Sequence, residues 1–384
     1  MDSFVFSYPT KVYFGEGAAA KAFKAELGQA GRMVMLAYGG GSIKRKVVYD
    51  QMKALLAGMG KDVVEFSGIM PNPTYAKAQE GAQLARREHV DFILAVGGGS
   101  VIDCCKVISA QALLDEDIFG MEYGAHRFPV QGIPMGAVVT ASGTGAEMNA
   151  GAVITHEEKK WKGPIFGTAA SFAALDPAYT LSLPMKQVIS GAFDTLSHCM
   201  ETYLGTPREP NLSDEMNEAI MRSVIAHIRT LLRDPQNMEA RSELMWASAM
   251  AENGLLKLGK ATDFQAHQIE HQLGAYTDCN HGQGLAVIHP ALYRHICLSA
   301  PKQFARLARE VWHVHGGTDE ATALAGVDAL ARFIREIGLP ATLGEMGITD
   351  ERVLRAVADT CNLTAGCCKQ LTRDEVFEIL KECL

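Results

Sequence analysis

The stretch FILAVGGGSVIDCCK, residues 92–106, contains a short apolar run, a turn and a segment of helical pattern. The run at 92–96 is typical of a buried strand, and the helix is expected to begin directly after the turn. Glycines at this place let the backbone approach a diphosphate, which the free N–H groups and the dipole of the helix start would stabilise. The motif is not GxGxxG, so a simple tight turn is the alternative. The turn consists of Gly97, Gly98, Gly99 and Ser100.

Further strand-and-helix units surround this stretch in the amino-terminal half. The pattern predicts strands at 33–38, 62–66, 91–96 and 135–140, and helices at 42–59, 75–88 and 100–114. After residue 185 it predicts helices almost throughout, with amphipathic runs at 213–232, 240–258 and 323–337. Strands that alternate with helices form a mostly parallel sheet with helices on both faces. We therefore expect an α/β domain over residues 1–184 and an all-helical domain over residues 185–384.

The composition is that of an ordinary globular protein. The chain has 384 residues, of which 48% are hydrophobic and 21% charged, so it can bury a large core. Its net charge of -8 is mild and no Lys/Arg tract occurs, which argues against a nucleic-acid or anionic-membrane partner. No apolar run approaches the ~18 residues of a membrane span and the start lacks the features of a signal peptide, so we expect a cytoplasmic protein. Nine cysteines without a CxxC pair indicate free thiols.

A second glycine turn follows the strand predicted at 33–38, with Lys44 and Arg45 close behind it. An acidic residue near such a strand end often binds the ribose hydroxyls and disfavours a 2′-phosphate, but no carboxylate occurs between Arg32 and Val48. Backbone amides, a hydroxyl and two cations suit a phosphorylated ribose and favour NADP over NAD. The alternative is that the two cations only solvate a helix start. The turn contains Gly39, Gly40, Gly41 and Ser42.

A third polar, glycine-rich segment, VVTASGTGAEMNAGAVI, follows the strand predicted at 135–140. Its hydroxyls and glycines suit a loop near a bound polar ligand, although this signal is weak by itself. The hydroxyl groups are those of Thr140, Ser142 and Thr144.

Five candidate metal ligands lie in the carboxy-terminal half. Asp194 and His198 are four residues apart, as are His267 and His271, so each pair projects from one face of a helix. The fifth is predicted in a loop, after a break at 278–280. A single histidine on a helix face is more often a packed or surface residue, but five such donors favour a divalent metal between two helices. The spacing does not say which four of the five ligate: Asp194, His198, His267, His271 and His281.

The combined pattern resembles the iron-containing (group III) alcohol dehydrogenase family, and within it the NADPH-dependent butanol dehydrogenases and broad-range aldehyde reductases. The resemblance extends over nearly the whole chain, in the same order. The motifs that carry it are PNP at 71–73, GGGS-x2-D-x2-K at 97–106, GTGAE at 143–147, DP at 176–177, D-x3-H at 194–198, and H-x3-H at 267–271 with a later HG.

The resemblance implies a fold and a metal site. The fold would be a Rossmann-like, dinucleotide-binding α/β domain followed by an all-α, dehydroquinate synthase-like metal-binding domain. His271 would be a catalytic histidine that does not ligate but passes a proton. Carboxylate and imidazole ligands accept Fe2+, Zn2+, Ni2+ and other divalent ions. The ligands implied are Asp194, His198, His267 and His281.

The resemblance also implies cofactor-binding residues and a homodimer. Gly97, Gly98, Gly99 and Ser100 would bind the pyrophosphate, and Gly39, Gly40, Gly41 and Ser42 the ribose and its 2′-phosphate. Asp103 would lie near the nicotinamide and take part in catalysis. The remaining cofactor contacts would come from Asn72, Thr140, Ser142, Thr144 and Lys160. The chain departs from the family at Ser142, at Ala146 and at Cys279–Asn280, where a proline is common, and the last change could shift His281.

The predicted function is therefore a metal-dependent, NADP(H)-linked alcohol dehydrogenase or aldehyde reductase. It would transfer hydride between nicotinamide C4 and a small alcohol or aldehyde such as butanol or butanal. A glycerol dehydrogenase-like polyol oxidoreductase on the same fold is the alternative. A dehydroquinate synthase-like lyase would need several cations around the metal, where the sequence offers only Lys257 and Lys260. A metal-dependent hydrolase would leave the three glycine turns without a common purpose.

Overall fold

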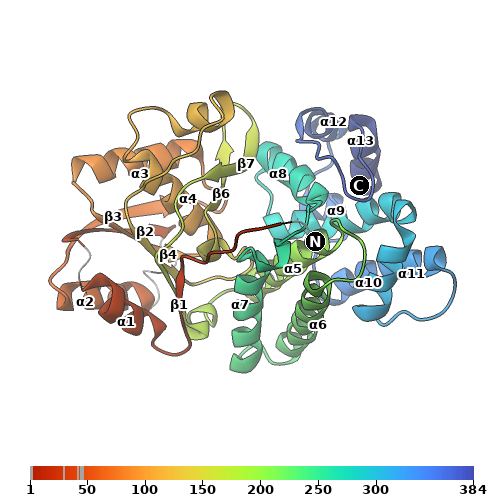
Figure 1. Ribbon diagram of the computed structural model, residues 1–384, viewed down its shortest axis with the longest axis horizontal. Helices are drawn as coiled ribbons and strands as arrows, with labels where there is room; N and C mark the ends of the chain where they lie inside the picture. The colour runs from red at the N-terminus through yellow and green to blue at the C-terminus, as the bar shows by residue number, and fades with distance from the viewer. Residues whose placement is uncertain (1–2, 29–30, 41–42, 44–46) are drawn as a thin grey trace. The chain divides into compact units, whose positions relative to one another are not determined.

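The computed structural model describes residues 3–28, 31–40, 43 and 47–384, and its contacts divide the chain into two compact units (Figure 1). One unit is Ser7–Leu183. The other is Pro184–Leu384 together with the first residues of the chain.

The Ser7–Leu183 unit is built on a six-stranded sheet in which every neighbouring pair is parallel. All residues of β4 (Phe92–Gly97) are buried, because this strand is covered on both faces. The carboxyl end of β4 lies level with those of the two adjacent strands, since Val96 pairs with Tyr38 on one side and with Val138 on the other. The order across the sheet is β1 (Lys11–Phe14), β8 (Phe172–Leu175), β5 (Met135–Val139), β4, β2 (Met33–Gly39) and β3 (Asp62–Ile69).

Helices cover both faces of this sheet, as predicted (Figure 1). Helices α1 (Ala18–Ala22) and α2 (Val47–Gly58) pack on the face that carries Leu36, Leu94 and Val96. Helices α3 (Tyr75–Arg87) and α4 (Gly99–Gln111) pack against each other, with α4 against β4. Successive side chains of β2 and β4 point to opposite faces of the sheet, and helices cover both faces. Both strands are therefore apolar throughout.

Four strands of the unit were not predicted. They are the outer pair β1 and β8 and an antiparallel hairpin, β6 (Gly151–His156) with β7 (Trp161–Phe166). Gly163 and Pro164 interrupt the β pattern of β7 and hid it in the sequence. A Cβ on Gly163 would lie 2.5 Å from the Trp161 ring, so packing requires this glycine.

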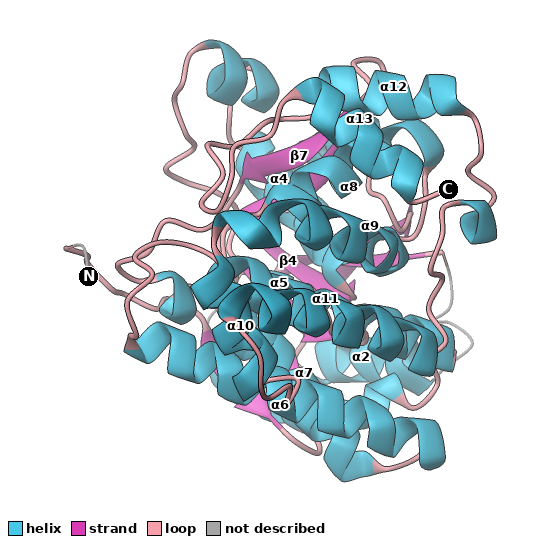
Figure 2. Cartoon of the chain, turned by 90° about the vertical axis from the view of Figure 1, so that its right-hand side faces the viewer, coloured by secondary structure: helices cyan, strands magenta, loops and turns pink. Residues whose placement is uncertain are grey.

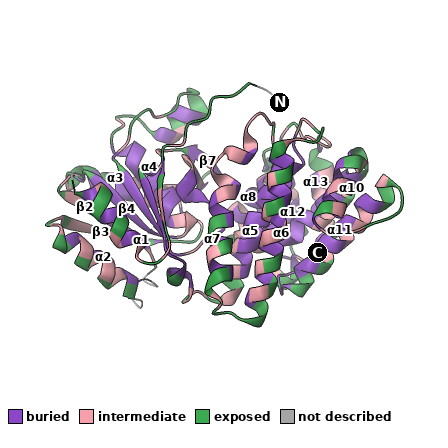
Figure 3. Cartoon of the chain, turned by 60° about the horizontal axis from the view of Figure 1, so that its bottom comes forward, coloured by how far each residue is buried: buried purple, intermediate pink, exposed green. Residues whose placement is uncertain are grey.

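The Pro184–Leu384 unit is helical, and its helices carry both buried and exposed residues (Figure 3). In α5 (Met185–Tyr203), every residue from Ala192 onward is buried. Helix α9 (His281–Ile296) contacts both α5 and α11 (Asp319–Glu336) (Figure 2). The helix predicted at 240–258 ends at Glu252, because Gly254 takes a left-handed conformation before a short turn, Leu255–Lys257. No helix in the described part of the chain is long and apolar enough to cross a bilayer. The other helices are α6 (Leu212–Arg233), α7 (Met238–Glu252), α8 (Gln265–Thr277), α9 (His281–Ile296), α10 (Pro301–Glu310), α11 (Asp319–Glu336), α12 (Glu351–Thr360) and α13 (Arg373–Glu382).

Candidate metal centre and nucleotide-binding turns

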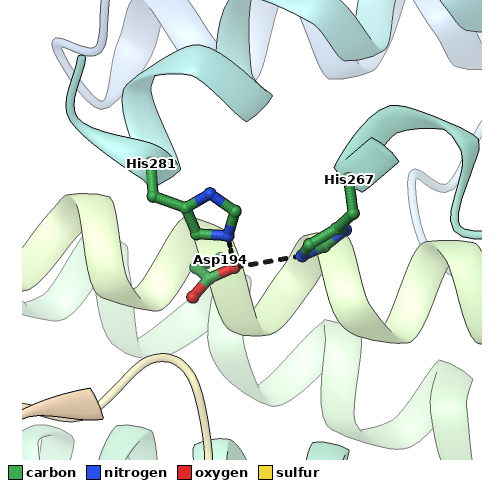
Figure 4. Close-up of side chains that lie close together, drawn as sticks. All are labelled: Asp194, His267 and His281. Atoms are coloured by element: carbon green, nitrogen blue, oxygen red, sulfur yellow. Dashed lines mark ion pairs between the residues drawn. The ribbon is translucent and has the colours of Figure 1, made fainter. Parts of the chain in front are cut away.

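Four of the five predicted metal donors meet at one carboxylate oxygen. Asp194 Oδ1 lies 3.5 Å from Nε2 of His198, 3.5 Å from Nε2 of His267 and 3.4 Å from Nε2 of His281. Asp194 and His198 lie one turn apart on α5, and His267 projects from α8 (Figure 4). The structure thus brings together donors that are far apart in the sequence, since Asp194 and His281 are 87 residues apart.

His281 is the first residue of helix α9, so its prediction as a loop residue was wrong. Asp278, in a left-handed conformation, ends α8, and Asn280 then begins α9 by accepting a hydrogen bond from the Gln283 N–H at 3.1 Å. The Ser190 hydroxyl of α5 also donates to Asn280 Oδ1 at 2.6 Å. Asn280 therefore anchors the first turn of α9 on α5 and holds His281 in the group around Asp194.

Buried polar atoms at this centre fit a divalent cation. Asp194 and His267 are only 2% and 3% exposed. Asp194 Oδ1, His267 Nε2 and His198 Nδ1 are buried without a hydrogen-bond partner among the described residues. A buried carboxylate oxygen or imidazole nitrogen without a partner costs free energy, which coordination of a metal would offset at the first two atoms. The donor set, one carboxylate and three imidazoles, suits Zn2+ or Fe2+.

Two buried glutamates lie behind the imidazoles and were missed in the sequence. Glu201 Oε2 contacts His267 Nδ1, while its Oε1 accepts a hydrogen bond from the Ala266 N–H at 2.7 Å. Glu270 Oε2 contacts His281 Nδ1 in the same way. Such carboxylates fix the ring orientation and the tautomer, with Nδ1 protonated and Nε2 free for a metal. Helical spacing contained the signal, because Glu201 lies seven residues after Asp194 and Glu270 three after His267.

The electrostatics of the centre favour a cation. Burial opposes the charge on Asp194, but the adjacent His198 and His281 lower the pKa of its carboxyl well below the ordinary value. Burial also disfavours a charged His267, yet Glu201 and Asp194 raise its pKa to about 10. Burial lowers the pKa of His198. Carboxylates that stabilise a proton on His267 to this extent would also stabilise a metal cation at its Nε2.

His271 lies beside this centre. Its ring stacks on that of His281, with centroids 5.4 Å apart, and meets the His267 ring edge-on at 5.9 Å. Among the described residues, two groups of donors have atoms that all lie within 4.8 Å of one another and could hold a metal: Asp194, His267 and His281, and Glu270, His271 and His281. His271 thus contacts the rings of two proposed ligands, and its catalytic role stays a prediction.

The turn after β4 meets the third glycine-rich segment. Gly98 precedes the first residue of α4, and its Cβ would lie 3.1 Å from the Ala141 Cβ. A Cβ on Gly99 would lie 2.3 Å from Thr144 Oγ1, and the Thr140 N–H donates to the Gly97 carbonyl at 2.9 Å. The two loops thus touch at the carboxyl end of β4, where a backbone cradle and a helix amino terminus suit a diphosphate.

The PNP segment joins the same edge of the sheet. The Ser100 hydroxyl donates to the Pro71 carbonyl, which places the loop that contains Asn72 beside the glycine turn. Ser142 lies in the loop that packs on this turn, whereas Lys160 lies in the exposed turn of the β6–β7 hairpin.

Asp103 has a structural role that the sequence did not reveal. Its Oδ1 accepts from the fully buried Lys106 Nζ at 3.1 Å, and its Oδ2 accepts from the Val153 N–H at 2.9 Å. Lys106 Nζ also donates to Asn149 Oδ1 at 3.0 Å and to the Gly151 carbonyl at 2.6 Å. The pair therefore ties α4 to β6, and a part in catalysis stays a prediction for Asp103.

The turn after β2 is described only in part. A Cβ on Gly39 would lie 3.1 Å from the Ile69 carbonyl oxygen, so packing accounts for this glycine. Among the described residues, no atom lies within 4 Å of the position that a Cβ on Gly40 would take. The predicted contacts at Gly41, Ser42, Lys44 and Arg45 lie outside the described residues.

Comparisons with known proteins agree with this arrangement. The model of the family "Iron-containing alcohol dehydrogenase" matches residues 9–177, and that of the "Fe-containing alcohol dehydrogenase family, C-terminal" matches residues 188–384. The chain is 38% identical, over 392 residues and 100% of both chains, to the probable NADH-dependent butanol dehydrogenase 1 of Bacillus subtilis (strain 168). It is 36% identical over 353 residues to the NADPH-dependent aldehyde reductase of Escherichia coli (strain K12), covering 91% of this chain and 90% of that one.

A solved structure extends the likeness to three dimensions. The NADH-dependent butanol dehydrogenase A of Thermotoga maritima has a TM-score of 0.94 with 35% identity, over 100% of this chain and 99% of that one. Both the parallel sheet and the helical half are thereby confirmed. Because the matches extend through both units, this chain belongs to the iron-containing alcohol dehydrogenase family.

Proposed function

We propose that this alcohol dehydrogenase depends on a divalent metal, prefers NADP(H) and works mainly as a reductase of small aldehydes such as butanal. The observation that carries the proposal is the convergence of three imidazole Nε2 atoms on Asp194 Oδ1. A metal held by these four side chains would supply Lewis-acid polarisation of the substrate oxygen. We assign the metal to the Pro184–Leu384 unit and the coenzyme to the Ser7–Leu183 unit.

The residues around the metal would orient the ligand rings and protonate the product oxygen. Glu201 and Glu270 hold the rings of His267 and His281 with Nε2 turned toward Asp194. The side chain of His281 is 24% exposed, whereas those of His198 and His267 are below 10%, so we assign the substrate side of the centre to His281. His271, stacked on His281, would give a proton from an imidazole nitrogen to the alkoxide oxygen after hydride transfer.

The cations near the ligand helices support an uncharged substrate. Lys257 Nζ lies 2.8 Å from Glu252 Oε2, and Lys260 forms a nearly fully buried ion pair with Asp214. Both charges are therefore compensated within the protein. A lyase that acts on a phosphorylated or acidic substrate would need such cations to be available to the ligand, which favours the dehydrogenase.

The preference for NADP(H) rests on the residues around β2. The segment after this strand carries no carboxylate before Val48. On the adjacent strand, Glu65 accepts hydrogen bonds from the Tyr38 and Tyr49 hydroxyls, both at 2.6 Å, and from Lys53 Nζ at 3.1 Å. These donors lower the pKa of Glu65 to about 2 and occupy its oxygens, so this carboxylate is not presented to a ribose. The names of the relatives divide between NADH and NADPH, which makes the coenzyme a direct test.

The experiment is the oxidation of NADPH with butanal by metal-stripped protein, before and after Fe2+ or Zn2+ is added, with NADH in parallel. Activity that returns with the metal and is higher with NADPH supports the proposal. Turnover without a metal would refute the metal site, and a preference for NADH would refute the coenzyme assignment. Light scattering on the same samples tests the homodimer, which stays a prediction.

A further inference from the structure

The three imidazoles around Asp194 differ in what lies behind them. Nδ1 of His267 and Nδ1 of His281 each contact a glutamate, Glu201 and Glu270 respectively. His198 Nδ1 instead lies 3.9 Å from its facing carboxylate, Glu252 Oε1, which is beyond hydrogen-bonding distance. Nδ1 of His198 is also buried and without a hydrogen-bond partner in the described residues. His198 is therefore the least supported of the proposed ligands.

Lys257 forms an ion pair with the second carboxylate oxygen of Glu252. Glu252 is the last residue of α7, and Lys257 ends the short turn that begins after Gly254. The ammonium group lies 2.8 Å from Glu252 Oε2, and the two side chains are 31% and 11% exposed. A close, partly shielded ion pair of this kind restrains a carboxylate and compensates its charge.

The same ammonium group is fixed by an aromatic ring. Lys257 Nζ lies 4.5 Å from the centroid of the Phe264 ring. Phe264 precedes α8 in a left-handed conformation, with φ 56°, which is costly for an aromatic residue. Its ring lies 5.1 Å from that of His267 and 6.1 Å from that of His198. Lys257 thus lies between Glu252 and Phe264, both of which flank the proposed ligands.

We propose that Lys257 is a positioning residue that holds the Glu252 carboxylate back from His198 and so lowers the affinity of the centre for divalent metal. The inference rests on the proposed metal site. A carboxylate that accepts a hydrogen bond from a ligating imidazole raises its basicity, and such contacts change metal affinity by about 10–100-fold. Lys257 keeps His198 from receiving this support, so His198 is the ligand that releases the metal first.

The test is the affinity for Zn2+, measured by competition with a chromophoric chelator. Lys257→Met removes the charge and keeps the length, so Glu252 can approach His198 Nδ1, and we expect about 10-fold tighter binding. Lys257→Arg keeps the ion pair and should bind as the wild type does. Unchanged or weaker binding by Lys257→Met would overturn the proposal, and circular dichroism of the metal-free variants checks that they are folded.

A double-mutant cycle separates positioning from a simple effect of charge. In a Glu252→Gln background the carboxylate is gone, so Lys257→Met should give no gain. A gain of the same size in both backgrounds would mean that Lys257 only repels the metal, which would overturn the positioning role. If the wild type and Asp194→Asn both fail to bind Zn2+ in this assay, the proposed metal site fails, an outcome distinct from the failure of this inference.

Discussion

The metal centre and the turn after β4 are built in opposite ways. At the metal centre, side chains converge, and their donor atoms lie within 3.5 Å of one carboxylate oxygen. At the turn, glycines remove side chains so that the backbone of one loop approaches another, with Gly99 against Thr144. A site built from side chains can be predicted from the spacing of its donor residues in the sequence. A site built from backbone atoms is marked in the sequence only by glycines, and close packing without any ligand can also require a glycine.

Two buried carboxyl groups, Asp194 in the helical unit and Glu122 in the α/β unit, show a second contrast. Burial acts against the charge of both Asp194 and Glu122, but imidazoles surround only Asp194, so its pKa falls. Glu122 accepts hydrogen bonds from the Phe166 N–H at 3.0 Å, and burial raises its pKa to about 7. Asp194 is thus suited to bind a cation, whereas Glu122 is suited to keep a proton.

The largest effect is expected where the side chains converge. Asp194→Asn keeps the shape but removes the charge that the three imidazoles face, so metal should be lost and kcat/KM should fall by about 10³-fold or more. Metal content by mass spectrometry and steady-state kinetics with butanal measure both. A variant that is fully active and free of metal would show that the centre is not catalytic.

A smaller effect is expected at Glu201, which contacts the proposed ligand His267. Glu201→Gln leaves His267 in place but replaces its charged acceptor by an amide, so metal affinity should fall by about 10–100-fold. The Zn2+ competition assay measures this change. Glu336→Gln, which affects only a partly exposed ion pair with Arg229, is a matched control that should bind Zn2+ normally. Equal affinity in the two variants would contradict the supporting role of Glu201.

The pH dependence of stability tests the contrast between the two carboxyl groups. Folded Glu122 keeps its proton up to a pH of about 7, whereas the unfolded chain loses it near 4.5, so this group lowers the free energy of unfolding as pH rises between these values. Glu122→Gln should remove this loss and make the protein more stable at pH 8 by roughly 2 kcal/mol. Urea unfolding at pH 5 and pH 8 measures it. An equal pH dependence in the variant and the wild type would rule out the raised pKa.

The smallest effect compares two glycines. Gly99→Ala would place a Cβ 2.3 Å from Thr144 Oγ1, so it should cost about 1–2 kcal/mol of stability. A Cβ on Gly40 meets no atom of the described residues within 4 Å, so Gly40→Ala should change stability by less than about 0.5 kcal/mol. Thermal unfolding distinguishes them, and a similar loss in both variants would contradict the packing of the two loops.

The sequence predicted the parts of the molecule that repeat in a regular way. Apolar strands followed by helices predicted the parallel sheet, and i, i+4 spacing predicted the donors on α5 and α8. The hairpin β6–β7 was missed because Gly163 and Pro164 break its pattern. The helical position of His281 was missed because the break at 278–280 was interpreted as the start of a loop, although Asn280 is a helix cap. The i, i+3 spacing of Asp103 and Lys106 on one helix could have indicated their ion pair. No local pattern could reveal that Asp103 also accepts from the Val153 N–H of β6, since that contact depends on tertiary packing.

The most direct measurement is anomalous X-ray diffraction at the zinc absorption edge from crystals of the Zn2+-loaded protein. One strong peak is expected within about 2.0–2.2 Å of an Asp194 oxygen and of Nε2 of His198, His267 and His281. A peak bound by His271 in place of one of these histidines, or no peak near Asp194, would contradict it.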